Sequence, residues 1–301
     1  MAIAADKRTG QDPDRYGPGP YSEWRRIDWS EHQHWVEVAG TTVNYVELGE
    51  GPPLLLVHGL AGSWQNWLET IPHFARTYRV LAPDLPGFGA SPMPPDPISI
   101  PGYGRLVDGF CEAVGVEHGV LVGNSMGGLI AAETAIQHPR RVDKLVLVSA
   151  VGITAEHQRN ERALAVMRRF EVALTWASTH PSPRFLMRPR ARHAMSLVFA
   201  HPEQLPGPLL VEQAKGSGKP GFIDALDALS DYPLRDRLKR ISVPTLIVWG
   251  DRDKLVPLRD ADVFEELIPN ARKIVYDDTG HVPMLERPAR FNADLESFLS
   301  E

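Results

Sequence analysis

The chain has 301 residues, enough for one large domain or for one domain that carries an insertion. Its hydrophobic content of 43 % and its charged content of 23 % are ordinary for a globular protein. The net charge of −6 argues against a general nucleic-acid-binding role, because there is no excess of basic residues to neutralise phosphates. The single cysteine, Cys111, excludes an internal disulfide and a cysteine-based zinc site.

The start of the chain predicts neither export nor membrane insertion. Residues 1–8 lack the apolar core of a signal peptide, and no apolar stretch approaches the roughly 20 residues needed to cross a bilayer. We therefore expect a cytoplasmic protein without stable membrane insertion. Residues 1–34, rich in Pro, Gly and charged residues, are expected to form an irregular arm. Tryptophans stand at positions 24, 29 and 35, so we expect the second half of this arm to pack on the main domain.

From residue 36 the chain alternates between strand-like and helix-like segments, which is typical of the α/β class. A β-hairpin is predicted at 36–38 and 42–48. The strands that follow are short apolar runs, as expected of strands buried on both faces, at 54–57, 80–82, 119–122, 144–148, 244–249 and 273–276. The predicted helices lie between or after them, at 64–76, 98–114, 126–138, 259–267 and 288–299.

Residues 153–234 interrupt this alternation. They contain helix-like stretches, 156–177 and 190–199 among them, and no clear strand. The pattern predicts a helical cap inserted over the sheet, between two parts of one core at 35–152 and 235–301. The core itself is predicted to be a mostly parallel sheet with helices on both faces and the opening hairpin at one edge.

The strongest functional signal is Ser125, which lies in Gly-Asn-Ser-Met-Gly-Gly at 123–128 between an apolar strand and a helix-like segment. This is a G-x-S-x-G pattern in the strand–turn–helix context that gives it meaning. The glycines permit a sharp turn, which exposes the serine at the carboxyl edge of the sheet. A serine hydroxyl is a poor nucleophile at neutral pH, so a general base must lie within hydrogen-bond reach.

Among the eleven histidines, His281 is the preferred base because its loop directly follows the last predicted strand. Parallel strands end at the same edge, so this loop opens where Ser125 emerges. Asp251 and Asp253 follow the strand at 244–249 and offer two carboxylates to orient the imidazole. A carboxylate directly after the glycine tends to be used in the turn itself, so Asp253 is favoured over Asp251.

Acyl transfer also needs two N–H donors directed at the developing oxyanion, each worth about 3 kcal/mol of the barrier. We expect the backbone N–H of Met126, which follows the nucleophile, and that of Leu60, in the turn after the strand at 54–57. His58 begins that turn, and we expect it to shape the turn rather than act as the base.

Two patterns that superficially suggest a metal or a cofactor are interpreted otherwise. His32 and His34 are close in sequence but have no evident third ligand, so no metal is expected there. The formal G-x-G-x-x-G at 216–221 follows no strand and is interrupted by Pro220, so it is interpreted as a flexible link between cap helices.

Four landmarks occur in the order found in serine hydrolases of the α/β-hydrolase fold, and the resemblance covers roughly residues 36–300. They are His58-Gly59, the turn at 84–91, the serine motif at 123–127, and Gly250-x-x-Asp253 followed by Gly280-His281. The resemblance implies an eight-stranded sheet, a cap at 153–234 and no cofactor. It also supports Asp253, because the family usually places the acid third after that glycine. A serine nucleophile separates the chain from haloalkane dehalogenases and epoxide hydrolases, which carry aspartate there.

The leading functional hypothesis is hydrolysis of small-molecule carboxylic esters with an apolar acyl or alcohol group, through an acyl-enzyme on Ser125. The alternative is a carbon–carbon bond hydrolase of the meta-cleavage product type, which the motif at 123–128 also resembles. Two departures count against it: Val282 stands where those enzymes usually carry tryptophan, and the loop at 58–62 is poorer in glycine. A third hypothesis, a non-catalytic ligand receptor, conflicts with a complete set of triad candidates. The sequence makes no prediction of the oligomeric state.

Overall fold

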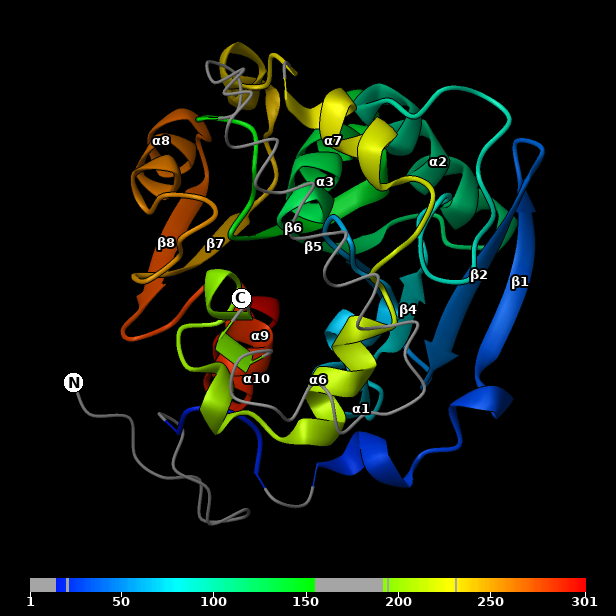
Figure 1. The fold of residues 1–301 in the computed structure, drawn as a ribbon. Helices are drawn as coiled ribbons and strands as arrows, with labels where there is room; N and C mark the ends of the chain where they lie inside the picture. The colour runs from blue at the N-terminus through cyan, green and yellow to red at the C-terminus, as the bar shows by residue number, and fades with distance from the viewer. Residues whose placement is uncertain (1–14, 20–21, 155–191, 194, 231) are drawn as a thin grey trace.

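The computed structural model describes residues 15–19, 22–154, 192–193, 195–230 and 232–301 (Figure 1). Its centre is an eight-stranded sheet in the order β1-β2-β4-β3-β5-β6-β7-β8. The strands are β1 Gln33–Val38, β2 Thr41–Leu48, β3 Pro53–Val57, β4 Arg79–Pro83, β5 Gly119–Asn124, β6 Val142–Val148, β7 Thr245–Gly250 and β8 Ala271–Tyr276. The pairs β1–β2 and β2–β4 are antiparallel, and all the other pairs are parallel. The predicted mostly parallel, eight-stranded α/β sheet is therefore confirmed.

Helices cover both faces of this sheet (Figure 1). One face packs against α2 Ile100–Ala113, α3 Met126–Gln137 and α8 Arg259–Leu267, and the other against α1 Ile71–Phe74, α9 Pro283–Glu286 and α10 Pro288–Leu299. Successive strand residues point to opposite faces, so Leu55 joins the first core whereas Leu54 and Leu56 join the second. Burial on both faces explains why these strands are continuous apolar runs.

The edge hairpin forms as predicted, because its turn has the backbone that a two-residue hairpin needs. Ala39 and Gly40 both adopt positive φ, 49° and 79°, which matches the twist of the flanking strands. Strand β1 begins at Gln33, two residues inside the span expected to be irregular. Before it lie two short 3-10 helices, Glu23–Arg26 and Trp29–Glu31. Trp24 is buried and donates its indole N–H to Glu69 at 2.7 Å, so this half of the arm packs on the core.

The helix predicted at 64–76 is wrong as a single element. The chain forms a 3-10 helix at Trp64–Trp67 and then the short helix α1. Pro72 explains the break, because proline fits only the first turn of a helix and clashes with the preceding turn elsewhere. The short helix α9 was not predicted.

Between β6 and β7 the described residues contain helices and loops but no strand. The helices are the 3-10 helices Met195–Leu197 and Pro202–Gln204, the helices α6 Gly207–Ala214 and α7 Phe222–Ser230, and the 3-10 helix Arg235–Arg240. The helix predicted at 190–199 is partly outside the described residues and at 195–197 is a 3-10 helix; the one predicted at 156–177 lies wholly outside them. None of the helices described is long and apolar enough to span a membrane.

Candidate active site

Four loops that carry the predicted site residues open at the carboxyl edge of the sheet. They follow β3, β5, β7 and β8, which are parallel and therefore end at the same edge. These loops hold Leu60, Ser125, Asp253 and His281, in that order. All but Asp253 line one cavity.

Ser125 sits on a sharp turn between β5 and α3, with φ 56° and ψ −118°. A non-glycine residue pays about 1–3 kcal/mol for such a backbone, and it persists because the surroundings fix it. A Cβ at Gly127 would lie 2.3 Å from the carbonyl oxygen of Val57, so only glycine allows this close approach. The Ser125 backbone N–H donates to the carbonyl of Val148 at 2.9 Å, which ties the turn to β6.

His281 and Asp253 are hydrogen-bonded, with 2.8 Å between Nδ1 and Oδ2. The side chain of His281 is 6 % exposed and that of Asp253 is 0 % exposed. The other carboxylate oxygen of Asp253 accepts from the backbone N–H groups of Leu255 and Val256, each at 2.9 Å. A carboxylate only accepts, so the proton of neutral His281 is on Nδ1 and Nε2 is left as a basic nitrogen.

Asp251, the second candidate acid, has a different partner. It is exposed, and its carboxylate accepts from the backbone N–H of Thr279 at 3.2 Å. The geometry therefore joins His281 to Asp253. The spacing argument expected Asp251 to be used within its own turn, but its carboxylate contacts Thr279 in the loop after β8.

His58 holds the loop after β3. Its Nδ1–H donates to the carbonyl of Gly59 at 2.8 Å, and its Nε2 accepts from the backbone N–H of Leu85 at 3.0 Å. The ring is wholly buried, and burial lowers the pKa of His58 to about 4, so it is neutral near pH 7. His58 thus shapes the turn, as expected, with both ring nitrogens occupied.

Asp84 braces the same loop from the end of β4. Its two carboxylate oxygens accept from the backbone N–H groups of Trp64 and Ala90, each at 2.8 Å. Burial raises the pKa of Asp84 to about 6. The sequence landmark at 84–91 is therefore a support for the loop that contains Leu60.

The backbone N–H groups of the two expected oxyanion donors have no other hydrogen-bond partner among the described residues. In the part of the chain that the structure describes, the backbone N–H groups of Leu60 and Met126 make no hydrogen bond outside the regular elements. Met126 is the first residue of α3, and the first N–H groups of a helix have no partner within it.

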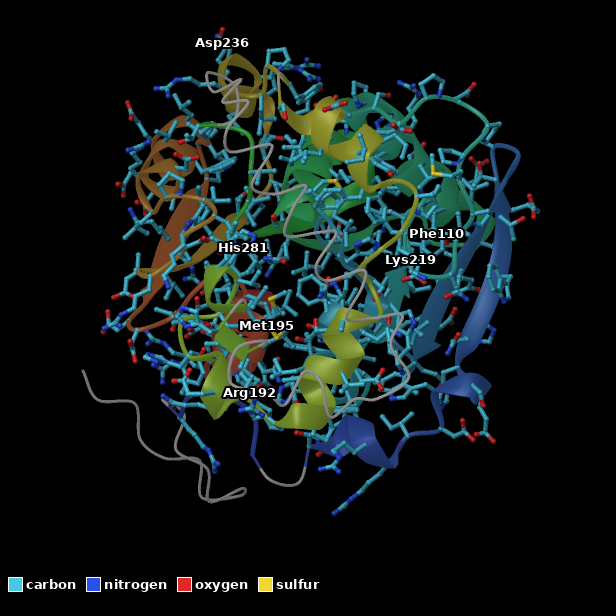
Figure 2. The ribbon with its side chains drawn as sticks, viewed as in Figure 1. Phe110, Arg192, Met195, Lys219, Asp236 and His281 are labelled. Carbon is cyan, nitrogen blue, oxygen red and sulfur yellow. The ribbon has the colours of Figure 1, made fainter. Side chains whose placement is uncertain are left out.

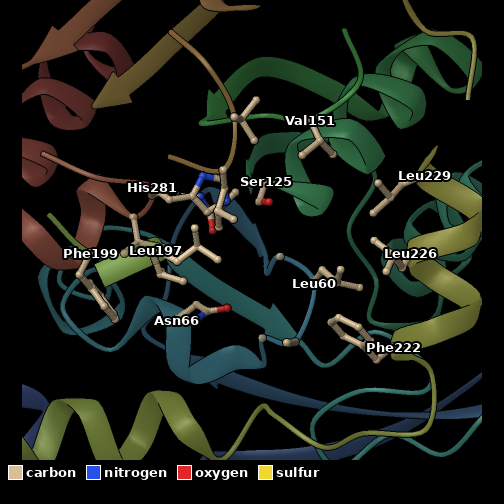
Figure 3. A pocket seen from close by; sticks show the side chains of 18 of the residues that line it. Leu60, Asn66, Ser125, Val151, Leu197, Phe199, Phe222, Leu226, Leu229 and His281 are labelled. Carbon is tan, nitrogen blue, oxygen red and sulfur yellow. Dashed lines mark hydrogen bonds between the residues drawn. The ribbon is translucent and has the colours of Figure 1, made fainter. Parts of the chain in front are cut away.

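The cavity beside Ser125 and His281 has a volume of about 280 Å³. Met195 and His281, both labelled in Figure 2, are among its lining residues. Apolar side chains from the segment between β6 and β7 dominate its walls, among them Leu197, Val198, Phe199, Phe222, Leu226 and Leu229 (Figure 3). None of the described lining residues is Lys or Arg.

One contact at this site was missed in the sequence. The side-chain amide of Asn124, directly before Ser125, donates to the carbonyl of Val148 at 3.1 Å and to that of His281 at 3.2 Å. It joins the serine turn to the histidine loop. No local signal announces this role, because the partner lies more than 150 residues away in the chain.

The chain belongs to the alpha/beta hydrolase fold family, whose model matches residues 52–288. It is 30 % identical over 285 residues to a 2-hydroxymuconate semialdehyde hydrolase from Pseudomonas putida, covering 87 % of this chain and 92 % of that one. It is also 30 % identical over 269 residues to a pimeloyl-[acyl-carrier protein] methyl ester esterase from Aeromonas hydrophila, covering 86 % and 99 %.

Solved structures of other hydrolases and degrading enzymes are also similar to this chain. A meta-cleavage product hydrolase superposes with a TM-score of 0.71 at 29 % identity, covering 90 % of this chain and 99 % of that one. An N-acyl homoserine lactone degrading enzyme superposes with a TM-score of 0.73 at 27 % identity, covering 88 % and 100 %. The chain is therefore a hydrolase of this family, and the relatives named here act on different substrates.

Proposed function

We propose that this protein hydrolyses carboxylic esters through an acyl-enzyme on Ser125. The observation that carries the proposal is the buried hydrogen bond between His281 and Asp253, beside a cavity that both Ser125 and His281 line. His281 Nε2 takes the proton of Ser125 Oγ as the oxygen attacks the acyl carbon. The backbone N–H groups of Leu60 and Met126 stabilise the oxyanion.

The reaction then proceeds in two halves. The imidazolium of His281 returns its proton to the departing alcohol oxygen as the carbon–oxygen bond breaks, which leaves the acyl group on Ser125. Water enters, gives a proton to His281 and attacks the acyl carbon, and the acid leaves as Ser125 regains its proton. Asp253 stabilises the imidazolium in both halves.

The substrate we propose is a small ester with an apolar acyl or alcohol group. The described walls are mostly apolar and include no Lys or Arg, so they favour uncharged acyl or alcohol groups. A substrate carboxylate without a partner would be costly to bury there. We further propose that residues 153–234 act as a cap that selects the substrate. Helix α7 supplies Phe222, Leu226 and Leu229 to the wall on the side of the cavity away from His281 (Figure 3).

The second candidate is carbon–carbon bond hydrolysis, which the similarity to 2-hydroxymuconate semialdehyde hydrolase favours. A further relative, from Metapseudomonas resinovorans, acts on a dienoic acid by its name, whereas the described cavity residues include no Lys or Arg to pair with a carboxylate. The test is turnover of p-nitrophenyl esters against a vinylogous 1,5-diketone acid by the same preparation. Faster turnover of the ester supports ester hydrolysis as the function. Turnover of the diketone alone would show that carbon–carbon bond hydrolysis is the function instead.

A further inference from the structure

Glu286, in α9, carries a carboxylate that is wholly buried and accepts four hydrogen bonds. Oε2 accepts from the Tyr16 hydroxyl at 2.7 Å, from the Ala200 N–H at 2.8 Å and from the Gly280 N–H at 2.9 Å. Oε1 accepts from the Val282 N–H at 3.2 Å. An ionised carboxylate offers about four lone-pair sites and no proton, so it suits four donors better than an amide would.

Two of these donors lie on either side of His281. The Gly280 and Val282 N–H groups both point to Glu286, and the intervening N–H of His281 donates to the Val198 carbonyl at 2.8 Å. Three consecutive backbone donors are therefore fixed by partners outside the loop. The imidazole carried by this backbone is the one hydrogen-bonded to Asp253.

The same carboxylate joins segments that are far apart in the sequence. Tyr16 comes from the N-terminal arm, and its hydroxyl also accepts from the His201 N–H at 2.9 Å. Ala200 belongs to the segment between β6 and β7, next to residues that line the cavity. The guanidinium of Arg287, the residue after Glu286, lies 5.1 Å from the centre of the Tyr16 ring.

We propose that Glu286 is a positioning residue for His281, which fixes the histidine loop by accepting from the residues on both sides of it. The proposal rests on the proposed function, in which His281 is the general base. Glu286 does not line the cavity, so it acts through the loop and not on the substrate. Its loss should therefore lower kcat and leave KM nearly unchanged.

The test is steady-state hydrolysis of p-nitrophenyl butyrate by Glu286→Gln and Glu286→Ala, with active sites counted by a fluorophosphonate probe. Glutamine keeps an oxygen for the donors at Oε2 but turns an amide toward Val282, whereas alanine removes every acceptor. Because a displacement of about 1 Å can cost a catalytic group about 100-fold, we expect kcat per labelled site to fall about 10-fold in Glu286→Gln and about 100-fold in Glu286→Ala.

Glu133→Gln is the matched control. Glu133, on α3, also carries a buried carboxylate and is 1 % exposed. It accepts a hydrogen bond from Arg237 at 2.8 Å and does not line the cavity. The Glu133→Gln variant should have a lower free energy of unfolding than the wild type but the same kcat per labelled site. A wild-type kcat per labelled site in Glu286→Gln, or an equal loss in Glu133→Gln, would overturn the inference. Wild-type protein that neither hydrolyses the ester nor reacts with the probe would instead refute the proposed function.

Discussion

The Nδ1 of His281 lies 2.8 Å from Oδ2 of Asp253, and the Asp253 side chain is fully shielded from solvent. The nearby Asp251 is exposed and accepts from the backbone of Thr279. Two carboxylates in one turn therefore have separate partners, and a pair of variants can tell them apart.

We expect Asp253→Asn to lower kcat by about 10⁴, because an amide in that place favours the wrong imidazole tautomer. Asp251→Asn removes one exposed acceptor and should change kcat only slightly. The measurement is ester hydrolysis by both variants per folded active site. If Asp251→Asn shows the larger loss, the acid has been assigned to the wrong residue.

A prediction on acid stability follows from His58 and Asp84, which brace the same loop with opposite pKa shifts. Burial lowers the pKa of His58 from 6.5 to about 4, so the stability that its neutral form contributes is lost as the pH falls through that range. Burial raises the pKa of Asp84 from 3.8 to about 6, so its contribution grows as the pH falls over nearly the same range. In the wild type the two trends oppose each other.

Asp84→Asn removes the compensating trend. We expect its free energy of unfolding to fall more steeply than that of the wild type between about pH 6.5 and about pH 4. Urea unfolding across this range measures the two slopes. Parallel curves, displaced by a constant, would show that Asp84 does not titrate as described.

We expect truncation of a cavity-lining side chain to change the preferred acyl chain length. Leu226 on α7 is buried and lines the cavity. Leu226→Ala opens space for a longer chain, and each added methylene that is buried gains about 0.8 kcal/mol, or roughly fourfold in kcat/KM. Hydrolysis of the p-nitrophenyl acetate ester should persist.

The matched control is Leu210→Ala, which removes an equally buried leucine of α6 that does not line the cavity. It should cost about 2–5 kcal/mol of stability, as core truncations do, without a shift in preference. A ratio of octanoate to acetate hydrolysis that is the same in both variants would contradict the role given to α7.

Local patterns in the sequence predicted the strands of the sheet and marked Ser125, Asp253 and His281 as candidates, because the relevant physics is local. Apolar runs mark strands buried on both faces, and the glycines around Ser125 mark a turn that larger residues would obstruct. The prediction of one helix at 64–76 was wrong because Pro72 cannot lie in the interior of a helix, although the other residues of this segment favour one. Asn124 and Glu286 escaped notice because each has a partner that is distant in the sequence: His281 lies 157 positions from Asn124, and Tyr16 lies 270 positions from Glu286.

The central claim is that Ser125 is the nucleophile. The most direct measurement is mass spectrometry of the protein after reaction with a fluorophosphonate probe, in the wild type and in Ser125→Ala. We expect one adduct, on the peptide that contains Ser125, and neither adduct nor ester hydrolysis in a folded Ser125→Ala variant. An adduct on another residue, or ester hydrolysis that survives in Ser125→Ala, would contradict it.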